Sequence, residues 1–395
     1  MAAAGNATTV QQHVRLSFQE SMSLVELPAP KDVMPRGPAG SPAVRKFMST
    51  RAAYLPTSDY PSDGGKLPKL HTAAFGGHVY AQAGYAACKC WRDLEDKRGM
   101  SERQGLHTIH GYFTLAGKCD RPFIYDVTAV TVSRSLATFI VTAYQPSEPS
   151  TNPQGDYFPL KDASLPLLDG PCFTALCSFK LAEPHSAGVS AQEEAPQIRF
   201  REVLSSRRPK EWLPAPIADI DAVVEFLGGH HVGAFPMVDM KKVDMTVFNE
   251  GKPYHERREL ILYRLLKPLP PAVDDGGSGH DANSHVLVHA YAADRNGLLM
   301  AGNHLGFGYS MGKAATISNT FVVHVNADEA VMRYCEDEDV SEGWWMQEVC
   351  FPRAGAGRGI ILNKIWSPEG VHVATEYQDG IIRSWEKRLD NKGKL

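Results

Sequence analysis

The sequence predicts an α+β protein in which one unit, a helix followed by consecutive strands, occurs twice. A glycine pair opens an alanine-rich stretch over Phe75–Trp91, which favours a helix, and segments rich in β-branched and aromatic residues follow it. The second half of the chain repeats this order, and a long internal repeat indicates duplication of one unit. A helix followed by consecutive strands is typical of an antiparallel sheet with helices on one face.

The length of 395 residues suits two domains of average size with some additions. We expect a partly ordered N-terminal extension over residues 1–62, a first domain over 63–182, a linker over 183–216 and a second domain over 217–388. The stretch 146–171 is dominated by Pro, Ser, Asp and Gly, so we expect an inserted loop there.

Within these domains, strands are expected where β-branched and aromatic residues concentrate. In the first half of the chain the expected strands are Val14–Leu27, Leu106–Leu115, Phe123–Ser133, Ala137–Gln145 and Cys172–Leu181. In the second half they are Val238–Phe248, Arg257–Leu265, Val286–Ala292, Thr316–Val325, Trp344–Phe351, Gly359–Trp366 and Val371–Gln378, with a helix from near Asp294 through Leu298–Ala301.

Composition limits the class of protein. Hydrophobic residues make up 43% and charged residues 22% of the chain, as in globular proteins, and the net charge is −4. We therefore expect no nucleic-acid partner and no attraction to an anionic membrane surface. No apolar run approaches the roughly 20 residues that cross a bilayer, so no membrane span is expected.

Cysteine usage and the chain ends bear on the cellular compartment. Seven cysteines, an odd number without metal-ligand spacing, indicate reduced thiols inside a cell and no metal site. The N-terminus lacks the basic start and apolar core of a secretory signal. The final residues Gly393-Lys394-Leu395 resemble the peroxisomal Ser-Lys-Leu signal. We expect a peroxisomal protein, or otherwise a cytoplasmic one.

Several stretches spread over residues 65–385 carry a resemblance to a known family. In the first half these stretches are Gly76–Ala83, His107–Phe113 and Arg121–Val127, and in the second half they are Tyr291–Asn296, Ala315-Thr316-Ile317 and Gln378-Asp379-Gly380. Together they resemble the type II acyl-CoA thioesterases. That resemblance implies a double hotdog, two fused domains in each of which a long antiparallel sheet wraps around one central helix.

The resemblance also implies an activity and its residues. It implies hydrolysis of acyl-CoA to free acid and CoA, without a cofactor or metal, in a homo-oligomer with one active site per chain. Asp294, Thr316 and Gln378 match the family's three catalytic positions. His78 and Lys180 take the positions of Asp294 and Gln378 in the first half, so we expect that half to be structural and to shape the acyl tunnel.

The chain departs from the family directly after Thr316-Ile317. Ser318 and Asn319 follow, where many members have an acidic residue and a histidine. The extension before residue 65 and the insertion at 146–171 are longer than in simpler members. These departures bear on the substrate more than on the reaction, so the sequence does not define the length or identity of the acyl group.

The predicted chemistry is direct attack by water on the thioester. Asp294 accepts a proton from water, while the Thr316 hydroxyl and the Gln378 amide orient that water. Backbone N–H groups at the helix start after Asp294 are expected to stabilise the oxyanion. Arg353 and Arg358 are candidates for contact with the CoA phosphates. Each of the three residues also has a structural alternative: a helix N-cap for Asp294, an ordinary strand residue for Thr316, and a turn for Gln378.

Three other functions compete with this interpretation. The stretch Gly308–Gly312 matches the nucleophile elbow of serine esterases, with Ser310 as nucleophile and His372 as a possible base. A hotdog hydratase would require proline and histidine where Gly297 and Leu299 stand. The third alternative is a non-catalytic acyl-CoA binding protein that keeps the fold.

Overall fold

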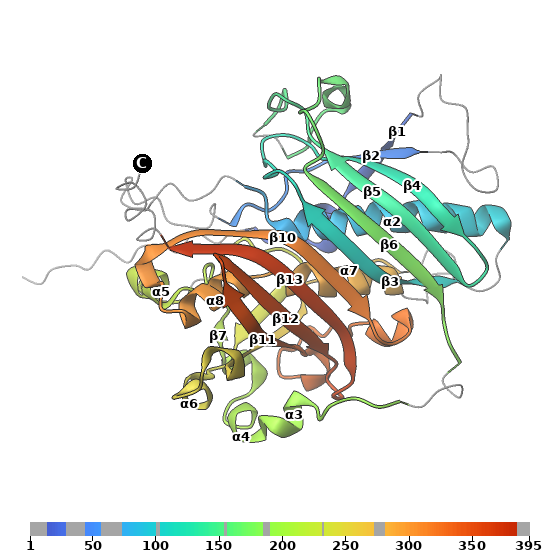
Figure 1. Ribbon diagram of the computed structural model, residues 1–395. Coiled ribbons are helices and arrows are strands. Elements are labelled where there is room, and N and C mark those ends of the chain that lie inside the picture. The colour runs from blue at the N-terminus through green and yellow to red at the C-terminus, as the bar shows by residue number, and fades with distance from the viewer. Residues whose placement is uncertain are drawn as a thin grey trace, which may run out of the picture.

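The structure is a computed structural model that describes residues 14–28, 44–56, 73–99, 103–153, 156–184, 190–230, 233–271 and 281–384. Its main feature is one continuous antiparallel sheet of 13 strands, to which both halves of the chain contribute (Figure 1). The strand order is β1-β2-β4-β5-β6-β3-β10-β13-β12-β11-β9-β8-β7. The predicted α+β class, an antiparallel sheet wrapped around central helices, is confirmed.

The first half supplies strands β1 to β6 and the long central helix α2. Their bounds are β1 Leu24–Leu27, β2 Arg45–Ser49, β3 Gln104–Phe113, β4 Ile124–Val132, β5 Leu136–Tyr144, β6 Phe173–Leu181 and α2 Gly76–Arg98, with the short α1 at Phe18–Ser21 and η3 at Leu160–Ser164. Four of these strands and α2 lie where the sequence predicts them. The N-terminal extension contributes β1 and β2, and β2 pairs with β4.

The second half supplies strands β7 to β13 and two consecutive helices. The strands are β7 Leu213–Pro214, β8 Val238–Lys242, β9 Arg258–Leu265, β10 Met311–Val323, β11 Trp345–Gly355, β12 Arg358–Trp366 and β13 His372–Ser384. The helices are α7 Ala282–Ala293 and α8 Gly297–His304, with the short α3 Pro196–Arg199, α4 Arg201–Leu204, α5 Asp221–Phe226 and α6 Thr246–Asn249. Single turns are η4 Pro209–Glu211, η5 Tyr254–Glu256, η6 Gly308–Ser310, η7 Ala327–Ala330 and η8 Ser341–Gly343.

The sheet is symmetric about its central pair, β3 and β10. Moving outward from β3, the strands are β6, β5, β4 and β2, and from β10 they are β13, β12, β11 and β9. The two central strands pair antiparallel, with His110 opposite Thr320. The two halves are therefore related by an approximate two-fold axis near this pair, as duplication of one unit predicts.

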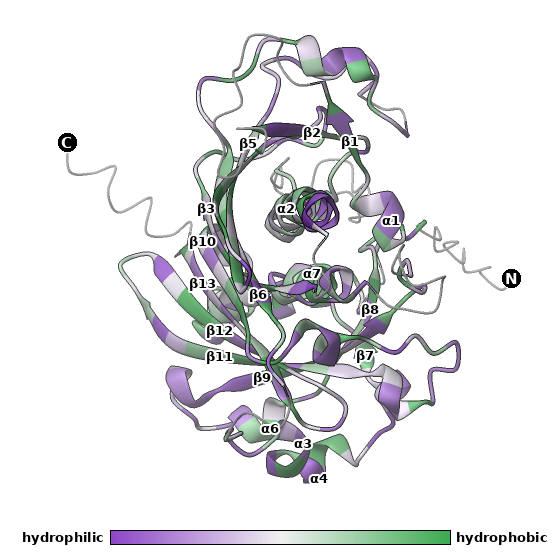
Figure 2. Ribbon diagram, turned by 90° about the vertical axis from the view of Figure 1, so that its right-hand side faces the viewer, coloured by the Kyte–Doolittle hydropathy of each residue, from purple (hydrophilic) through white to green (hydrophobic). Residues whose placement is uncertain are grey.

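Two helices, α2 and α7, lie side by side inside the curve of the sheet (Figure 2). Most residues of α2 and almost all of α7 are buried, because a helix enclosed by the sheet is apolar on nearly every side. Gly84 allows their close contact: a Cβ atom there would lie 2.5 Å from Leu287 Cδ2. At Gly99 the chain adopts a left-handed conformation that ends α2.

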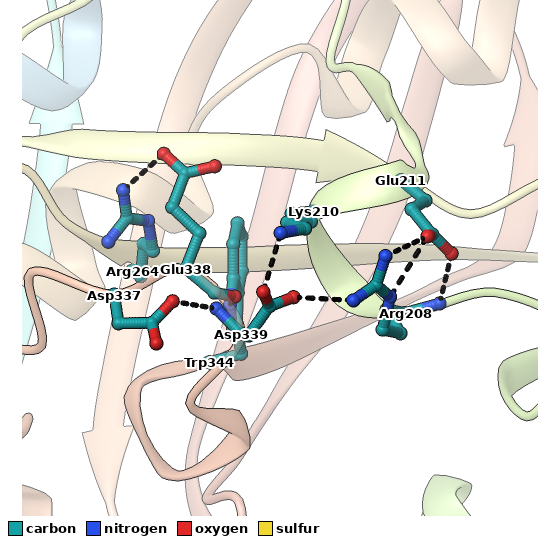
Figure 3. A network of polar contacts seen from close by, with 8 residues as sticks. All are labelled: Arg208, Lys210, Glu211, Arg264, Asp337, Glu338, Asp339 and Trp344. Atoms are coloured by element: carbon teal, nitrogen blue, oxygen red, sulfur yellow. Dashed lines mark hydrogen bonds and ion pairs between the residues drawn. The ribbon is translucent and has the colours of Figure 1, made fainter.

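The segment 190–214 packs on the outer side of the second half and is anchored by buried and charged contacts. Phe200 and Trp212 join a small apolar cluster with Trp344 and Trp366. At the surface, Arg208 and Lys210 form ion pairs with Asp339 (Figure 3). The neighbouring acidic loop is held by further contacts, from Arg264 to Glu338 Oε1 and from Trp344 Nε1 to the Glu338 carbonyl.

Three secondary-structure predictions were wrong in whole or in part. Residues Val286–Ala292 form helix α7 instead of a strand, because a segment that is apolar on every side shows neither a helical nor a strand period. The predicted strand Val238–Phe248 ends at Lys242, and α6 follows. In Val14–Leu27 only Leu24–Leu27 is a strand, because Ser17 and Glu20 form a capping box that starts α1.

Three further predictions concern the C-terminal tripeptide, membrane spans and the domain boundaries. The tripeptide Gly393-Lys394-Leu395 lies outside the described residues. Among the helices that are described, none is both long enough and apolar enough to span a membrane. The domain boundaries at residues 62, 182 and 216 stay predictions.

Candidate active site

Three side chains predicted from the sequence meet at one point between the two halves. Asp294 directly follows α7, Thr316 lies on β10 and Gln378 lies on β13. Thr316 Oγ1 donates a hydrogen bond to Asp294 Oδ1 at 3.3 Å, and Gln378 Nε2 donates to the same oxygen. Gln378 Nε2 also lies 3.0 Å from Thr316 Oγ1. One carboxylate oxygen thus accepts hydrogen bonds from both the Thr316 hydroxyl and the Gln378 amide.

A break between two helices positions Asp294. Helix α7 ends at Ala293, Asn296 adopts a left-handed conformation with φ 63°, and α8 starts at Gly297. The Asn296 side chain fixes this turn by donating to the Pro216 carbonyl at 2.8 Å. Asp294 therefore ends one helix, and the expectation that it opens the next helix was wrong.

Local irregularities bring Thr316 and Gln378 to this carboxylate. The register between β10 and β13 shifts between Thr316 and Ser318, as at a β-bulge, and bulges re-aim side chains. Gly297 leaves room for the amide, since a Cβ atom there would lie 2.9 Å from Gln378 Oε1.

The first half of the chain also reaches this site, through the start of α2. A Cβ atom at Gly76 would lie 3.0 Å from Asp294 Oδ2, and one at Gly77 would lie 2.9 Å from the Tyr291 carbonyl. The Gly77 backbone N–H donates a hydrogen bond to the Asp294 carboxylate. The glycine pair thus lets the amide-bearing end of a 23-residue helix meet the carboxylate. From the sequence, this pair indicates only the start of a helix.

Burial changes the acidity of the site. It raises the pKa of Asp294 to about 7, although the hydrogen bonds from Gly77, Thr316 and Gln378 act in the opposite direction. A second carboxyl group, Glu376, is fully buried two residues before Gln378 on the same strand. Its pKa is raised well above the usual range by burial and by the neighbouring Asp294 charge. Asn319 Nδ2 donates to Glu376 Oε1 at 2.6 Å.

The sequence does not indicate Glu376 as a site residue, because its position beside Asp294 depends on strand register. Glu376 and Gln378 are two residues apart and lie on the same buried face of β13, but a lone glutamate in a strand gives no functional signal by itself. Asn319, its partner on β10, is one of the two residues at which the chain departs from the thioesterase pattern.

The counterpart of this site in the first half differs from the prediction. The register between β3 and β6 shifts between Leu106 and Thr108, which matches the shift after Thr316 in the second half. In this alignment Leu106 corresponds to Thr316 and Cys177 to Gln378. In the helices, Tyr85-Ala86-Ala87-Cys88 corresponds to Tyr291-Ala292-Ala293-Asp294.

The assignment of His78 and Lys180 as counterparts was therefore wrong. His78 lies in the first turn of α2, whereas Asp294 follows the last turn of α7. His78 is buried, its Nδ1 accepts from the Tyr54 N–H at 3.4 Å, and burial lowers its pKa to about 3. Phe75–His78 and Tyr291–Asp294 share an aromatic-small-small-polar pattern, which suggested that they correspond. Neither residue order nor composition reveals which end of a helix faces the site.

The serine-esterase alternative is not supported by geometry. Ser310 Oγ donates to the Phe307 carbonyl, and it lies 3.2 Å from the Ser384 hydroxyl at the end of β13. His372 is the first residue of that 13-residue strand and stacks on Trp366. At about 3.3 Å per residue, the two ends of the strand are about 40 Å apart. Ser310 and His372 therefore do not form a catalytic pair.

The hydratase alternative lacks its required residues in space as well as in sequence. Gly297 packs against Gln378 and Ile361 and opens α8. Leu299, which stands at the required histidine position, is an aliphatic residue of that helix. No acid–base pair on one helix results.

The two arginines predicted to contact CoA lie on the hairpin that joins β11 and β12. Arg358 Nε donates to Asp379 Oδ1 at 3.0 Å, and the two side chains form an ion pair directly beside Gln378 in sequence. Arg353 lies opposite Ile360 near the same turn. Ala356 and Gly357 both have positive φ, as the predicted hairpin turn requires. Phosphate binding by these arginines stays a prediction.

A single sheet wrapped around central helices, with a buried carboxylate where its two halves meet, defines a double-hotdog protein. Residues 65–179 match the family model described as acyl-CoA thioesterase N-terminal domain. The acyl-CoA thioesterase 2 of Haemophilus influenzae is 22% identical over 78% of this chain and 87% of its own length. The human acyl-coenzyme A thioesterase 8 is 23% identical over 90% of this chain and 95% of its own length.

Solved structures agree on the fold. An acyl-CoA thioesterase II from Mycobacterium marinum superposes with a TM-score of 0.53 at 20% identity, covering 93% of this chain and 97% of that one. A structure from Thermobifida fusca, described as a thioesterase II whose function is not established, has a TM-score of 0.52 at 12% identity. The match covers 94% of this chain and 100% of that one. The chain is thus similar to acyl-CoA thioesterases in sequence, most specifically over residues 65–179, and to type II thioesterases in fold over most of its length.

Proposed function

We propose that this protein hydrolyses acyl-CoA to a free acid and CoA by direct attack of water, with Asp294 as the general base. The supporting observation is the convergence of Thr316 and Gln378 on one oxygen of a buried carboxylate. The Thr316 hydroxyl and the Gln378 amide hold the water beside that carboxylate. The oxygen of this water attacks the thioester carbonyl carbon as one of its protons passes to Asp294. Collapse of the tetrahedral intermediate then releases the CoA thiolate.

The acidity of Asp294 suits this role. A general base works best when its pKa lies near the working pH, and burial raises the pKa of Asp294 to about 7. Ordinary aspartates, with pKa near 4, are much weaker bases for extracting a proton from water. The environment of Asp294 therefore favours a proton-transfer role over a purely structural one.

We assign stabilisation of the oxyanion to the start of α2, in place of the start of the helix after Asp294 that the sequence suggested. Helix starts carry free N–H groups and a partial positive charge, and this one lies beside the base, since a Cβ atom at Gly76 would be 3.0 Å from Asp294 Oδ2. One such donor is worth about 3 kcal/mol of barrier in related chemistry. In this proposal the first half supplies the electrostatic stabilisation, and the second half supplies the base.

Thiol release measured across a panel of acyl-CoAs tests the function. We expect release by the wild-type protein and a loss of about 100-fold or more in Asp294→Asn, because general-base catalysis typically contributes at least that factor. Ser310→Ala serves as the control and keeps its activity. Binding of acyl-CoA without thiol release by the wild type would establish the non-catalytic alternative. Loss of activity in Ser310→Ala alone would support the serine-esterase alternative.

Two further parts of the proposal concern the assembly and the compartment. We expect a homo-oligomer, which light scattering of the purified protein measures directly. The human relative is named acyl-coenzyme A thioesterase 8, and peroxisomal import is expected from Gly393-Lys394-Leu395. A fluorescent protein carrying the last residues of this chain, compared with one in which Leu395 is deleted, reports on import.

A further inference from the structure

A cavity of about 260 Å³ lies at the end of α2 opposite to Asp294, where α2 meets the start of α7. Its walls include Cys88 and Leu106, which correspond by the approximate two-fold axis to Asp294 and Thr316. The third counterpart, Cys177, interacts electrostatically with Cys88 and is therefore close to it. The cavity thus occupies the position of a second site, related by the internal duplication to the site around Asp294.

Its chemistry differs from that of the Asp294 site. A thiol, an isobutyl group and a second thiol replace the carboxylate, the hydroxyl and the amide. Burial raises the pKa of both Cys88 and Cys177, so both thiols stay protonated at neutral pH. Without a base or a water-orienting pair, this cavity has no means of activating water.

The cavity nevertheless has the features of a binding site for an acyl chain with a polar, anionic head. Trp91, Leu106 and Val325 provide an apolar lining.

Three cations and three carboxylates line the cavity. Arg92 and Arg103 line the cavity, and each is held in place by acidic neighbours: Arg92 by Asp281 at 2.9 Å, and Arg103 by Asp96 at 2.7 Å and Glu95 at 3.4 Å. Lys180 also lines the cavity and forms no ion pair within the described part of the chain. The remaining lining carboxylate is Asp328. Lys180 is therefore the cation most available to a phosphate group.

We propose that this cavity binds a second acyl-CoA molecule and does not hydrolyse it. The apolar lining accepts the acyl chain, and Lys180 contacts a phosphate. This inference rests on the proposed function for the class of ligand. It does not depend on the catalytic roles of Asp294, Thr316 and Gln378.

Calorimetric titration of the inactive Asp294→Asn protein with octanoyl-CoA tests this inference. Two binding events per chain are expected. In the same background, Lys180→Glu reverses the free charge and Ala282→Trp fills the cavity, and each removes one event. Lys161→Glu, an equal charge reversal on an exposed lysine of η3, is the matched control and keeps both events.

A single binding event in Asp294→Asn, or two events that survive both cavity variants, would overturn the proposal. Titration with octanoate and with CoA alone identifies the group that is recognised. Saturation of the cavity by octanoate, without competition from octanoyl-CoA, would assign it to a free acid instead. Thiol release by the wild type is read separately, so failure of the catalytic proposal is distinguishable from failure of this one.

Discussion

Asp294 is a buried carboxylate whose hydrogen-bond donors, the Gly77 amide, the Thr316 hydroxyl and the Gln378 amide, are all neutral. Neutral donors hold the carboxylate without the strong pKa depression that a bound arginine or lysine causes. The same residue type on the surface would be fully ionised and weakly basic at neutral pH. The basicity that the reaction needs therefore comes from the surroundings of Asp294.

We predict that kcat/KM for an acyl-CoA rises with pH through a midpoint near 7, because only the deprotonated Asp294 accepts a proton and its pKa is raised to about 7. The measurement is thiol release at fixed low substrate concentration across pH 5 to 9. A midpoint near 4, the value of an ordinary aspartate, would contradict the assigned role.

Glu376→Gln is the matched test of the neighbouring acid. Glu376 faces Asp294 as well as Tyr80, Asn319 and Asn363, and its raised pKa keeps it protonated while Asp294 ionises. Since a protonated glutamic acid and glutamine are both neutral, the midpoint of the rate profile should not move. A shift of that midpoint to lower pH would show that Glu376 carries charge in the wild type.

The raised pKa of Asp294 also has a cost in stability. A carboxyl group with a higher pKa in the folded state stabilises the fold at low pH, and this contribution is lost as pH rises through the folded-state pKa. At about 1.4 kcal/mol per pKa unit, the loss amounts to several kcal/mol by pH 8. We predict that Asp294→Asn is more stable than the wild type at pH 8 and that the difference vanishes near pH 4. Denaturant titrations at both pH values measure it.

At the scale of elements, the start of α2 and the break between α7 and α8 place the site. Gly77 tolerates no side chain, because its Cβ would lie 2.7 Å from the Phe75 ring and 2.9 Å from the Tyr291 carbonyl. A backbone atom cannot move aside as a side-chain tip can. The helix start must therefore shift if a methyl group is added there.

We predict that Gly77→Ala lowers kcat by about 10-fold or more, because it displaces backbone donors from Asp294 and small misplacements near the reacting atoms are costly. Gly84→Ala in the same helix is the control. Its Cβ meets the tips of Leu287 and Ile109, so it should reduce the free energy of unfolding and leave kcat near the wild-type value. Equal losses of kcat in both variants would show that the effect comes from general destabilisation of α2.

A buried ion pair joins helix α3 to strand β11. Arg199 of α3 donates through Nη1 and Nη2 to both oxygens of Glu348 on β11, at 2.8 Å and 2.6 Å, and the Glu348 side chain is only 1% exposed. Arg258 Nε lies 3.7 Å from Glu348 Oε1, so it would compensate in part for the loss of Arg199. We predict that Arg199→Ala costs about 2 kcal/mol, because it leaves a buried carboxylate poorly paired. The double variant with Glu348→Gln should recover part of this loss in denaturant titrations.

For the whole molecule, the pairing of β3 with β10 joins two similar halves into one sheet and one core. The main core cluster contains buried residues of both halves, including Tyr80 and Leu287. The candidate site lies where they meet, and it takes Gly77 from the first half and Asp294 from the second. Neither half contains a complete site.

We therefore predict that the protein unfolds in one cooperative transition. Far-ultraviolet and near-ultraviolet circular dichroism should give coincident denaturation curves, because removal of either half exposes the core face of the other. The second half expressed alone, from residue 190, should show no thiol release even though it carries Asp294, Thr316 and Gln378. Separate transitions for the two halves would contradict a shared core.

The sequence by itself determined the α+β class, most of the strands, and the three polar residues of the candidate site. These follow from local composition and from motifs whose residue types are fixed by chemistry. Only the tertiary structure decided that Val286–Ala292 is helical, that Gly77 contacts Asp294, that Glu376 lies beside it, and that Cys88 rather than His78 is the counterpart of Asp294. Each of these facts depends on strand register or on which ends of two helices meet, and such long-range geometry leaves no local trace in the order of residues.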